Sequence, residues 1–329
     1  MIIKHKIFRS ELQSLYKLIK KLGDPEIEQY HAEVVSSRPW VRLVLSQNTI
    51  GVIVPAITHD SCRNINLQNI SVRFNVTVDI LQNGARSTQN VAIIETVTRD
   101  TAVEKLFLDV ISILLPAIPF VNNDNLVEII NDLIAFFRAL TTDSKKDALG
   151  LWGELFVIAR ANNASVLTQA WHSNPVDLYD FALHDQRIEV KTTTGPRKHI
   201  FSYPQTVTSP EISVLLASII TQETDSGKSV REMLDLVQSK ISDPKLITHV
   251  EKLAMQTLAK SWICGSEFRC DYDLACQSLK WFKMEEIPRV APPPPHVYDI
   301  QFKSDLQLSI DLQPTELSLT GNLGKAFVK

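Results

Sequence analysis

Two carboxylates and an amine lie at close spacing in one stretch of the chain. Asp180 is followed nine residues later by Glu189, and Lys191 comes two residues after that glutamate. Oxygen atoms are the ligands that Mg²⁺ prefers, and a lysine beside such an ion can position a water or neutralise charge on a phosphate. This set of residues is therefore suited to metal-assisted hydrolysis of a phosphodiester bond.

The sequence around these residues predicts a β-hairpin that would bring them together. Residues 178–183 are largely apolar, 184–186 supply turn residues, and 187–193 alternate between polar and apolar side chains. A two-residue turn at His184-Asp185 would place Asp180 opposite Glu189, with the two side chains about 5 Å apart on one face. The apolar opposite face favours a central position for the hairpin in its sheet.

The register of the hairpin decides which acidic residue enters the site. With a two-residue turn, Lys191 shares the face of Glu189, while Ile188 and Val190 point into the core. A three-residue turn would shift the pairing and bring Asp177 into the site. Asp177 is therefore the alternative acidic ligand.

These spacings alone also fit an exposed hairpin with a cross-strand ion pair. Two further features favour a functional site. Glu154 lies on the apolar helical stripe of residues 151–158, where a carboxylate needs a partner. A local group of basic residues suited to phosphate follows the hairpin, namely Arg197, Lys198 and His199.

The stretch 149–205 resembles the PD-(D/E)XK family labelled DUF4420. The resemblance rests on residues 150–158 (GLWGELFVI), Trp171, Asp180-Phe181 and residues 188–193, with His199 and Gln205 after them. It implies a restriction-endonuclease-like core, as in bacterial and archaeal proteins that often lie near defence genes. The family's aspartate falls on Asp180, its Glu-x-Lys on Glu189 and Lys191, and its helical Gly-Glu on Gly153 and Glu154.

We expect these residues to divide the work of a nuclease. Asp180, Glu189 and the Val190 carbonyl would hold Mg²⁺ (or Mn²⁺), and Glu154 would bind a second ion or its water shell. Lys191 would position the water or stabilise developing charge. Pro175 precedes Val176-Asp177, whereas Tyr179 precedes Asp180, so Asp177 stays open as the ligand. The expected substrate contacts are Arg197, Lys198, His199 and Gln205, the last two on the family pattern alone.

The composition bounds the class of protein. The chain has 329 residues, 44% of them hydrophobic and 22% charged, which is typical of a globular protein. Its net charge of −3 disfavours a nonspecific nucleic-acid binder. The four cysteines form no Cys-x-x-Cys pair, and no apolar run is long enough to span a membrane. We expect a cytoplasmic protein with free thiols.

The periodicity predicts a mixed α/β (α+β) fold. Residues 1–142 would form an N-terminal β-rich unit with a helical pair. The resemblance to DUF4420 implies that residues 143–329 form a restriction-endonuclease-like core, a central mixed sheet flanked by helices, followed by C-terminal helices and strands. Within this core, 212–220 would be a central strand and 306–312 the last strand.

These residues lead us to expect a Mg²⁺-dependent DNA endonuclease, and the resemblance to DUF4420 implies a place in a prokaryotic restriction or anti-phage defence system. The alternative is a catalytically silent DNA-binding or assembly subunit of a defence complex. The intact Asp–Glu–Lys set favours the first, and the acidic net charge favours the second. The expected partners are DNA and other defence-system proteins. A homodimer is one way to cut both strands with one site per chain.

Overall fold

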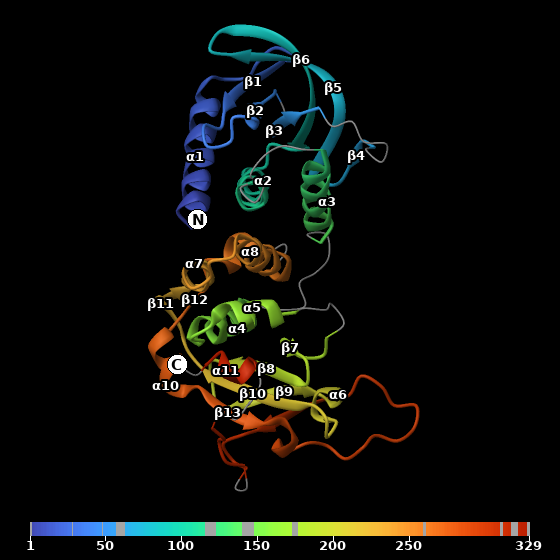
Figure 1. Cartoon of the computed structure of the whole chain (residues 1–329), viewed down its shortest axis with the longest axis vertical. Coiled ribbons are helices and arrows are strands. Elements are labelled where there is room, and N and C mark those ends of the chain that lie inside the picture. The colour runs from blue at the N-terminus through green and yellow to red at the C-terminus, as the bar shows by residue number, and fades with distance from the viewer. Residues whose placement is uncertain are drawn as a thin grey trace. The chain divides into compact units, whose positions relative to one another are not determined.

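The computed structural model describes residues 2–27, 29–47, 49–56, 63–115, 123–139, 148–172, 177–258, 261–309, 312–316 and 322–327. The chain forms two compact units, Met1–Asp143 and Ser144–Lys329 (Figure 1). The expected boundary between residues 142 and 143 lies outside the described residues. A search of the described helices finds none with the length and hydropathy of a membrane span. The fold is mixed α/β, as predicted.

The first unit is built around a sheet that closes on itself. Its strand order is β1-β2-β3-β6-β5-β4, and β1 also pairs with β5, in parallel, so that five strands form a ring. Asn83 and Gly84 have φ values of 50° and 79° in the turn that joins β5 to β6, as a two-residue hairpin turn requires. The predicted β-rich unit is therefore present. The strands are β1 (Gln29–Val34), β2 (Arg42–Leu45), β3 (Ile50–Pro55), β4 (Ile65–Asn66), β5 (Ile70–Gln82) and β6 (Ala85–Thr96).

Helices accompany this sheet in the first unit. Asp100 begins α2 by accepting hydrogen bonds from the N–H groups of Ala102 and Val103. Glu104 in α2 is buried, and its carboxylate accepts hydrogen bonds from Tyr16 and Lys20 of α1. These bonds satisfy a carboxylate that burial would otherwise penalise. The helices are α1 (Ile2–Lys21), α2 (Thr101–Leu114) and α3 (Asn123–Ala139).

The second unit contains a four-stranded mixed sheet in the order β13-β10-β8-β7. The interior strands β8 and β10 pair in parallel, from Gln186 opposite Ser213 to Thr193 opposite Ile220. The prediction of a central strand over 212–220 is confirmed. The hairpin is not wholly central, because the three-residue β7, with Ala182 and Leu183 only half-buried, lies at the edge of this sheet. The strands are β7 (Phe181–Leu183), β8 (Gln186–Thr193), β10 (Ser213–Ile220) and β13 (Lys280–Lys283).

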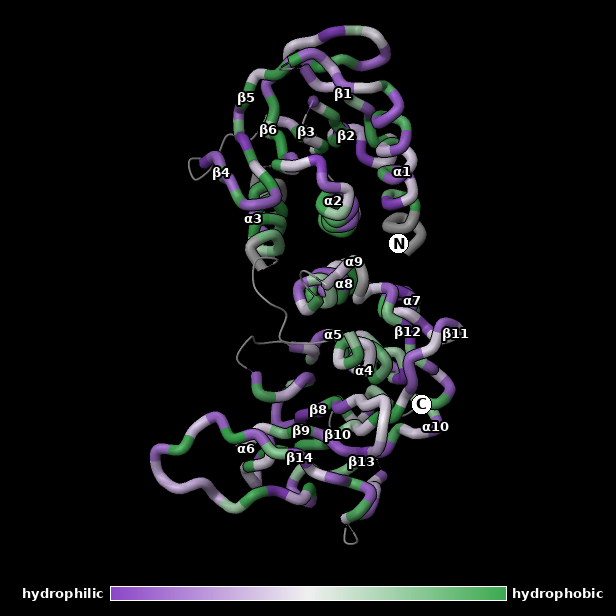
Figure 2. Tube along the Cα trace, turned by 180° about the vertical axis from the view of Figure 1, so that it is seen from behind, coloured by the Kyte–Doolittle hydropathy of each residue, from purple (hydrophilic) through white to green (hydrophobic). Residues whose placement is uncertain are grey.

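One face of this sheet is covered by α4 (Ala148–Arg160), in which every residue from Leu151 to Ala159 is buried. A helix that is apolar all round must be covered on all sides. It packs against β8 on one side and against α7 and α8 on another, and its apolar residues appear green in Figure 2. Further helices of this unit are α5 (Ala164–Ala170), α7 (Val230–Ser239), α8 (Pro244–Leu258), α9 (Trp262–Gly265), α10 (Tyr272–Ser278) and α11 (Asn322–Lys325).

The other face of the sheet packs against a two-stranded ribbon. In this ribbon β9 (Lys198–Ser202) pairs antiparallel with β14 (Gln301–Asp305), and Phe201 of β9 joins a buried cluster with Val214 and Leu216 of β10. The predicted last strand over 306–312 is wrong, because residues 306–308 form a turn in which the N–H groups of Gln307 and Leu308 donate to the Asp305 carboxylate. Residues 310 and 311 of this stretch lie outside the described residues. The remaining elements are α6 (Tyr203–Thr206), β11 (Glu223–Ser229), β12 (Arg269–Cys270) and η3 (Met284–Glu286).

Candidate active site

The β7–β8 hairpin has the predicted register. Leu183 pairs with Gln186 and Phe181 with Ile188 across the two-residue turn at His184-Asp185. The φ of His184 is 54°, as such turns require at their first central residue. This register excludes the three-residue turn. The paired residues end at Phe181, so Asp180 lies just outside the strand.

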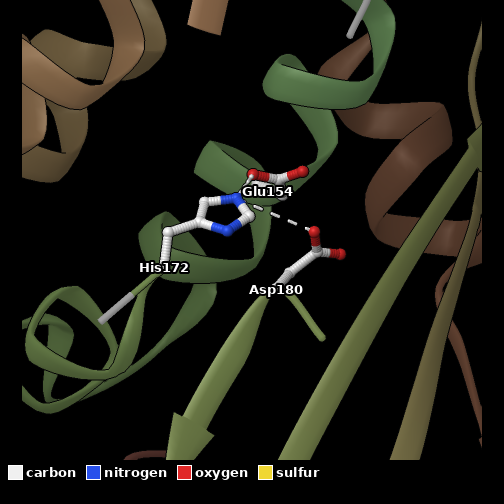
Figure 3. A group of neighbouring side chains, drawn as sticks. All are labelled: Glu154, His172 and Asp180. Atoms are coloured by element: carbon white, nitrogen blue, oxygen red, sulfur yellow. Dashed lines mark hydrogen bonds and ion pairs between the residues drawn. The ribbon is translucent and has the colours of Figure 1, made fainter. Parts of the chain in front are cut away.

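Three potential metal ligands meet beside this hairpin (Figure 3). Oε2 of Glu154 lies 3.1 Å from Nε2 of His172, and this nitrogen lies 3.8 Å from Oδ1 of Asp180. One potential ligand atom from each residue lies within 4.8 Å of the other two. Glu154 and Asp180 are buried, whereas 28% of the His172 side chain is exposed. We call these three residues the ligand group. Two carboxylates and an imidazole can together hold a divalent cation.

The position of Glu154 is set by a close approach between α4 and β8. A Cβ atom at the preceding residue, Gly153, would lie 1.8 Å from Oγ1 of Thr192. Only glycine therefore lets the helix come this near to the strand. The indole N–H of Trp171 donates a hydrogen bond of 2.8 Å to Oε2 of Glu154. Both contacts hold a buried carboxylate beside the end of the hairpin.

Backbone bonds place His172 and Asp180 side by side. Trp171 forms an antiparallel bridge with Phe181, and the N–H of His172 donates to the carbonyl of Asp180 at 2.9 Å. His172 has a φ of 41°, an uncommon value for a residue with a side chain. The carboxylate of Asp180 accepts a bond of 2.8 Å from the N–H of Val190 in β8. Main-chain hydrogen bonds thus hold the backbone of His172 beside Asp180 and hold the Asp180 carboxylate against β8.

Glu189 and Lys191 form a second group on the same strand. Oε1 of Glu189 lies 2.7 Å from the Lys191 amine and accepts a bond of 2.8 Å from the side-chain amide of Gln205. Thr192 contacts α4, so side-chain alternation directs Glu189 and Lys191 to the opposite face of the sheet. There the Lys191 amine lies 5.7 Å from the centre of the Phe201 ring.

The predicted convergence of Asp180, Glu189 and Lys191 is therefore met in part. The structure brings Glu189 to Lys191, but the Glu189 carboxylate does not belong to the ligand group. The reason is local: the strand pairing ends before Asp180, whose carboxylate then lies between the Val190 N–H and His172.

A comparison with protein families agrees with this architecture. The family model described as "Putative PD-(D/E)XK family member, (DUF4420)" matches residues 36–307. The chain belongs to DUF4420. No curated protein and no solved structure matches it. The match extends over strands of the first unit as well as the second, so DUF4420 is defined by more than the hairpin and its acidic residues. The family description indicates a nuclease-like fold.

In this DUF4420 member the expected basic surface patch is not formed. Arg197 is buried, and its guanidinium donates to the carbonyl and hydroxyl of Ser218 at 2.6 and 2.7 Å. Lys198 faces the solvent and pairs with Asp305 at 3.0 Å. His199 is buried again. This alternation is that of β9, whose odd-numbered side chains point into the core. The expectation that Arg197 and His199 contact a substrate directly is therefore corrected.

His199 is held in its neutral form. Its Nε2 lies 2.6 Å from the hydroxyl of Ser218. Burial, together with the positive charges of Arg197 and Lys191, lowers the pKa of His199 to about 3. A neutral imidazole in the core adds no positive charge for a phosphate, so its role here is to join β9 to β10.

Two further predicted residues have definite places. Gln205 forms a capping box with Ser202 at the start of α6 and also contacts Glu189, so it supports an acidic residue of the DUF4420 motif. Asp177 is half-buried and does not belong to the ligand group. Pro175 and Val176, which suggested Asp177 as the ligand, lie outside the described residues.

His172 is the residue that the sequence prediction missed. It follows Trp171, which the DUF4420 pattern contains, but a lone histidine in a loop carries no spacing that marks a ligand. Its neighbours in space come from α4 and from the start of β7. The available indication was its place directly after a tryptophan of the family pattern.

Proposed function

We propose that this DUF4420 member is a divalent-metal-dependent nuclease that cleaves DNA phosphodiester bonds. One observation carries the proposal: the Asp180 carboxylate is fixed beside Glu154 and against Val190, the middle residue of a Glu-x-Lys motif. The family description, with its nuclease-like fold, supports the same conclusion.

The residues present fit a divalent cation. Asp180 and Glu154 offer carboxylate oxygens. In a strand the N–H and C=O of one residue point to the same neighbour, so the carbonyl of Val190 faces the same side of β8 as the N–H that bonds Asp180. Mg²⁺ and Mn²⁺ both accept such oxygen ligands. A cation bound there would polarise a phosphate oxygen and lower the pKa of a water molecule.

Lys191 and Glu189 supply the other half of the chemistry. The Lys191 side chain is 24% exposed on the face of the sheet opposite α4, so its amine can donate to a phosphate oxygen or a water that lies against that face. Glu189 holds this amine at 2.7 Å, and Gln205 holds Glu189 in turn. We infer that Lys191 donates a hydrogen bond to the group that gains negative charge. Glu189 orients this lysine from the face of the sheet opposite α4.

A second candidate function is a silent DNA-binding or assembly subunit. The observation that favours it is that the basic residues after the hairpin form no open patch. Arg197 and His199 are buried, and Lys198 is paired with Asp305. The net charge of −3 gives the chain no overall positive charge to draw it to DNA. For both candidate functions, we propose that the chain acts beside other proteins of a prokaryotic restriction or anti-phage system. It would do so as a homodimer or with a partner.

The purified 329-residue chain mixed with supercoiled plasmid tests the proposal, with Mg²⁺, Mn²⁺ or EDTA in parallel reactions. We expect metal-dependent nicking that is lost in Asp180→Ala and in Glu189→Ala. The matched control is Asp185→Ala, which removes an exposed carboxylate from the turn of the same hairpin and should leave nicking unchanged. Retention of DNA without nicking in every metal would favour the silent subunit.

A further inference from the structure

We propose that His172 is a nitrogen ligand of the metal and that it makes the site prefer first-row transition ions to Mg²⁺. The inference rests on the proposed metal-dependent function, yet it concerns binding, which can be measured without any cleavage. Its basis is the ligand group, in which the imidazole lies between the two carboxylates (Figure 3).

The spacing of the three ligand atoms suits one shared ion. Ligands held at about 2.1 Å from an octahedral ion lie roughly 3 Å apart when adjacent and about 4.2 Å apart when opposite. The observed separations are 3.1 Å from Glu154 to His172 and 3.8 Å from His172 to Asp180. All three ligand atoms lie within 4.8 Å of one another. A small contraction would therefore place each at bonding distance from a common centre.

The surroundings hold the group in place and leave a way in. Trp171 donates to the same Glu154 oxygen that faces His172, which is the kind of outer hydrogen bond that orients a metal ligand. The His172 backbone is tied to Asp180. The side chains of Glu154 and Asp180 are 1% and 11% exposed, whereas that of His172 is 28% exposed. An ion can therefore enter past the imidazole and reach two buried carboxylates.

The nitrogen changes which ion is preferred. Mg²⁺ takes oxygen ligands and keeps several of its waters, so an imidazole adds little to its binding free energy. Imidazole binds first-row transition ions well, and for a given site affinity rises from Mn²⁺ to Co²⁺. Glu154 and Asp180 alone would make an ordinary magnesium site. Because His172 adds a nitrogen ligand, we expect the site to bind Co²⁺ most tightly, Mn²⁺ less tightly and Mg²⁺ most weakly.

Binding of Co²⁺ and Mg²⁺ to the untagged 329-residue chain tests this proposal. Calorimetry gives the affinities, and the visible absorption of Co²⁺ responds to a change in its ligands and geometry. We expect Co²⁺ to bind at least about tenfold more tightly than Mg²⁺. His172→Gly should cost about 10- to 100-fold in Co²⁺ affinity, change the Co²⁺ spectrum, and weaken Mg²⁺ binding far less. Glycine is chosen because it tolerates the positive φ of residue 172; His172→Asn, which also tolerates it, repeats the test.

His184→Gly is the matched control, since it removes an exposed imidazole at another positive φ, in the turn of the hairpin. It should leave Co²⁺ binding and the spectrum as in the wild type. The proposal is overturned if the wild type binds no Co²⁺ at millimolar concentration, if His172→Gly binds Co²⁺ as the wild type does, or if it loses both ions equally. A chain that binds Co²⁺ through His172 and never cuts DNA would overturn the nuclease proposal alone.

Discussion

The carboxylate of Asp180 accepts a hydrogen bond from the backbone N–H of Val190 at 2.8 Å. This bond links the residue before β7 to the middle of the Glu-x-Lys motif in β8, just beyond the last paired residues of the hairpin. Asp180 therefore has two tasks. Its side chain closes the end of the sheet by satisfying a backbone donor, and it presents its other oxygen to Glu154 and His172.

These two tasks can be separated by substitution. Asp180→Ala removes the acceptor and leaves the Val190 N–H buried without it, which should cost about 1–3 kcal/mol of unfolding free energy. Asp180→Asn keeps a carbonyl oxygen for this bond and should stay closer to wild-type stability, yet both variants should lose metal binding and nicking. Urea unfolding and calorimetry check the two effects. If Asp180→Ala and Asp180→Asn lower the unfolding free energy equally, the bond to the Val190 N–H does not have the proposed structural role.

Lys191 should matter for rate even when its charge is kept. Lys191→Arg retains a cation for the buried Glu189 and should unfold near the wild-type urea concentration. A guanidinium differs from an amine in shape and hydrogen-bond geometry, so nicking should fall by about 10²-fold or more. Lys191→Ala should lose both activity and stability, because Glu189 is then buried without its cation. The control is Lys283→Ala, which breaks an exposed pair with Glu286 in the same unit and should change neither.

The buried His199 should make stability depend on pH. Its pKa is lowered from 6.5 to about 3 in the folded chain. Between these two values the unfolded chain binds the proton and the folded chain does not, so stability is full above pH 6.5 and falls as the pH drops toward 3. One such group contributes a slope of about 1.4 kcal/mol per pH unit. Urea unfolding at pH 7, 6 and 5 should show a shallower slope in His199→Gln. His296→Gln, at an exposed position, should keep the wild-type slope.

Gly153 should resist substitution because of Thr192. In Gly153→Ala the new Cβ would meet Oγ1 of Thr192 at 1.8 Å, and overpacking of this kind costs about 1–3 kcal/mol. The displaced helix would also move Glu154 and weaken metal binding. Adding Thr192→Ala removes the clashing oxygen and should restore part of the stability, whereas adding Thr192→Ser should not. No recovery in the Ala–Ala double variant would show that another contact sets the distance between α4 and β8.

Local patterns were sufficient to predict the hairpin and its helix. Turn residues at His184-Asp185 determined the register, because a two-residue loop permits a single pairing. The apolar stripe around Glu154 indicated that this carboxylate would be buried near other functional groups, as it is. In both cases the information lies within a few residues of the feature that it determines.

Features that depend on distant contacts were not predictable in the same way. His172 joins the ligand group through a bridge between Trp171 and Phe181, and no periodicity encodes such a bridge. The end of the strand pairing at Phe181, which separates Asp180 from Glu189, is likewise set by packing. The burial of Arg197 and His199 is different. Residues 197–201 alternate between buried and exposed, so applying strand periodicity to this stretch would have placed both side chains in the core.

The closed ring of strands in the first unit limits how that unit can recruit other molecules. An open sheet edge offers unpaired backbone groups to which a strand of another chain can add. In the ring of β1, β2, β3, β6 and β5 each strand has a neighbour on both sides, and within the described part of the unit the two-residue β4 is the strand outside it. Along the paired lengths of the ring a partner must therefore bind through side chains and loops. Residues 85–90 of β6 pair with β5 but lie beyond the pairing of β6 with β3, so they keep a backbone edge that a strand could join. The closure protects the paired lengths from the edge-to-edge aggregation to which open sheets are prone.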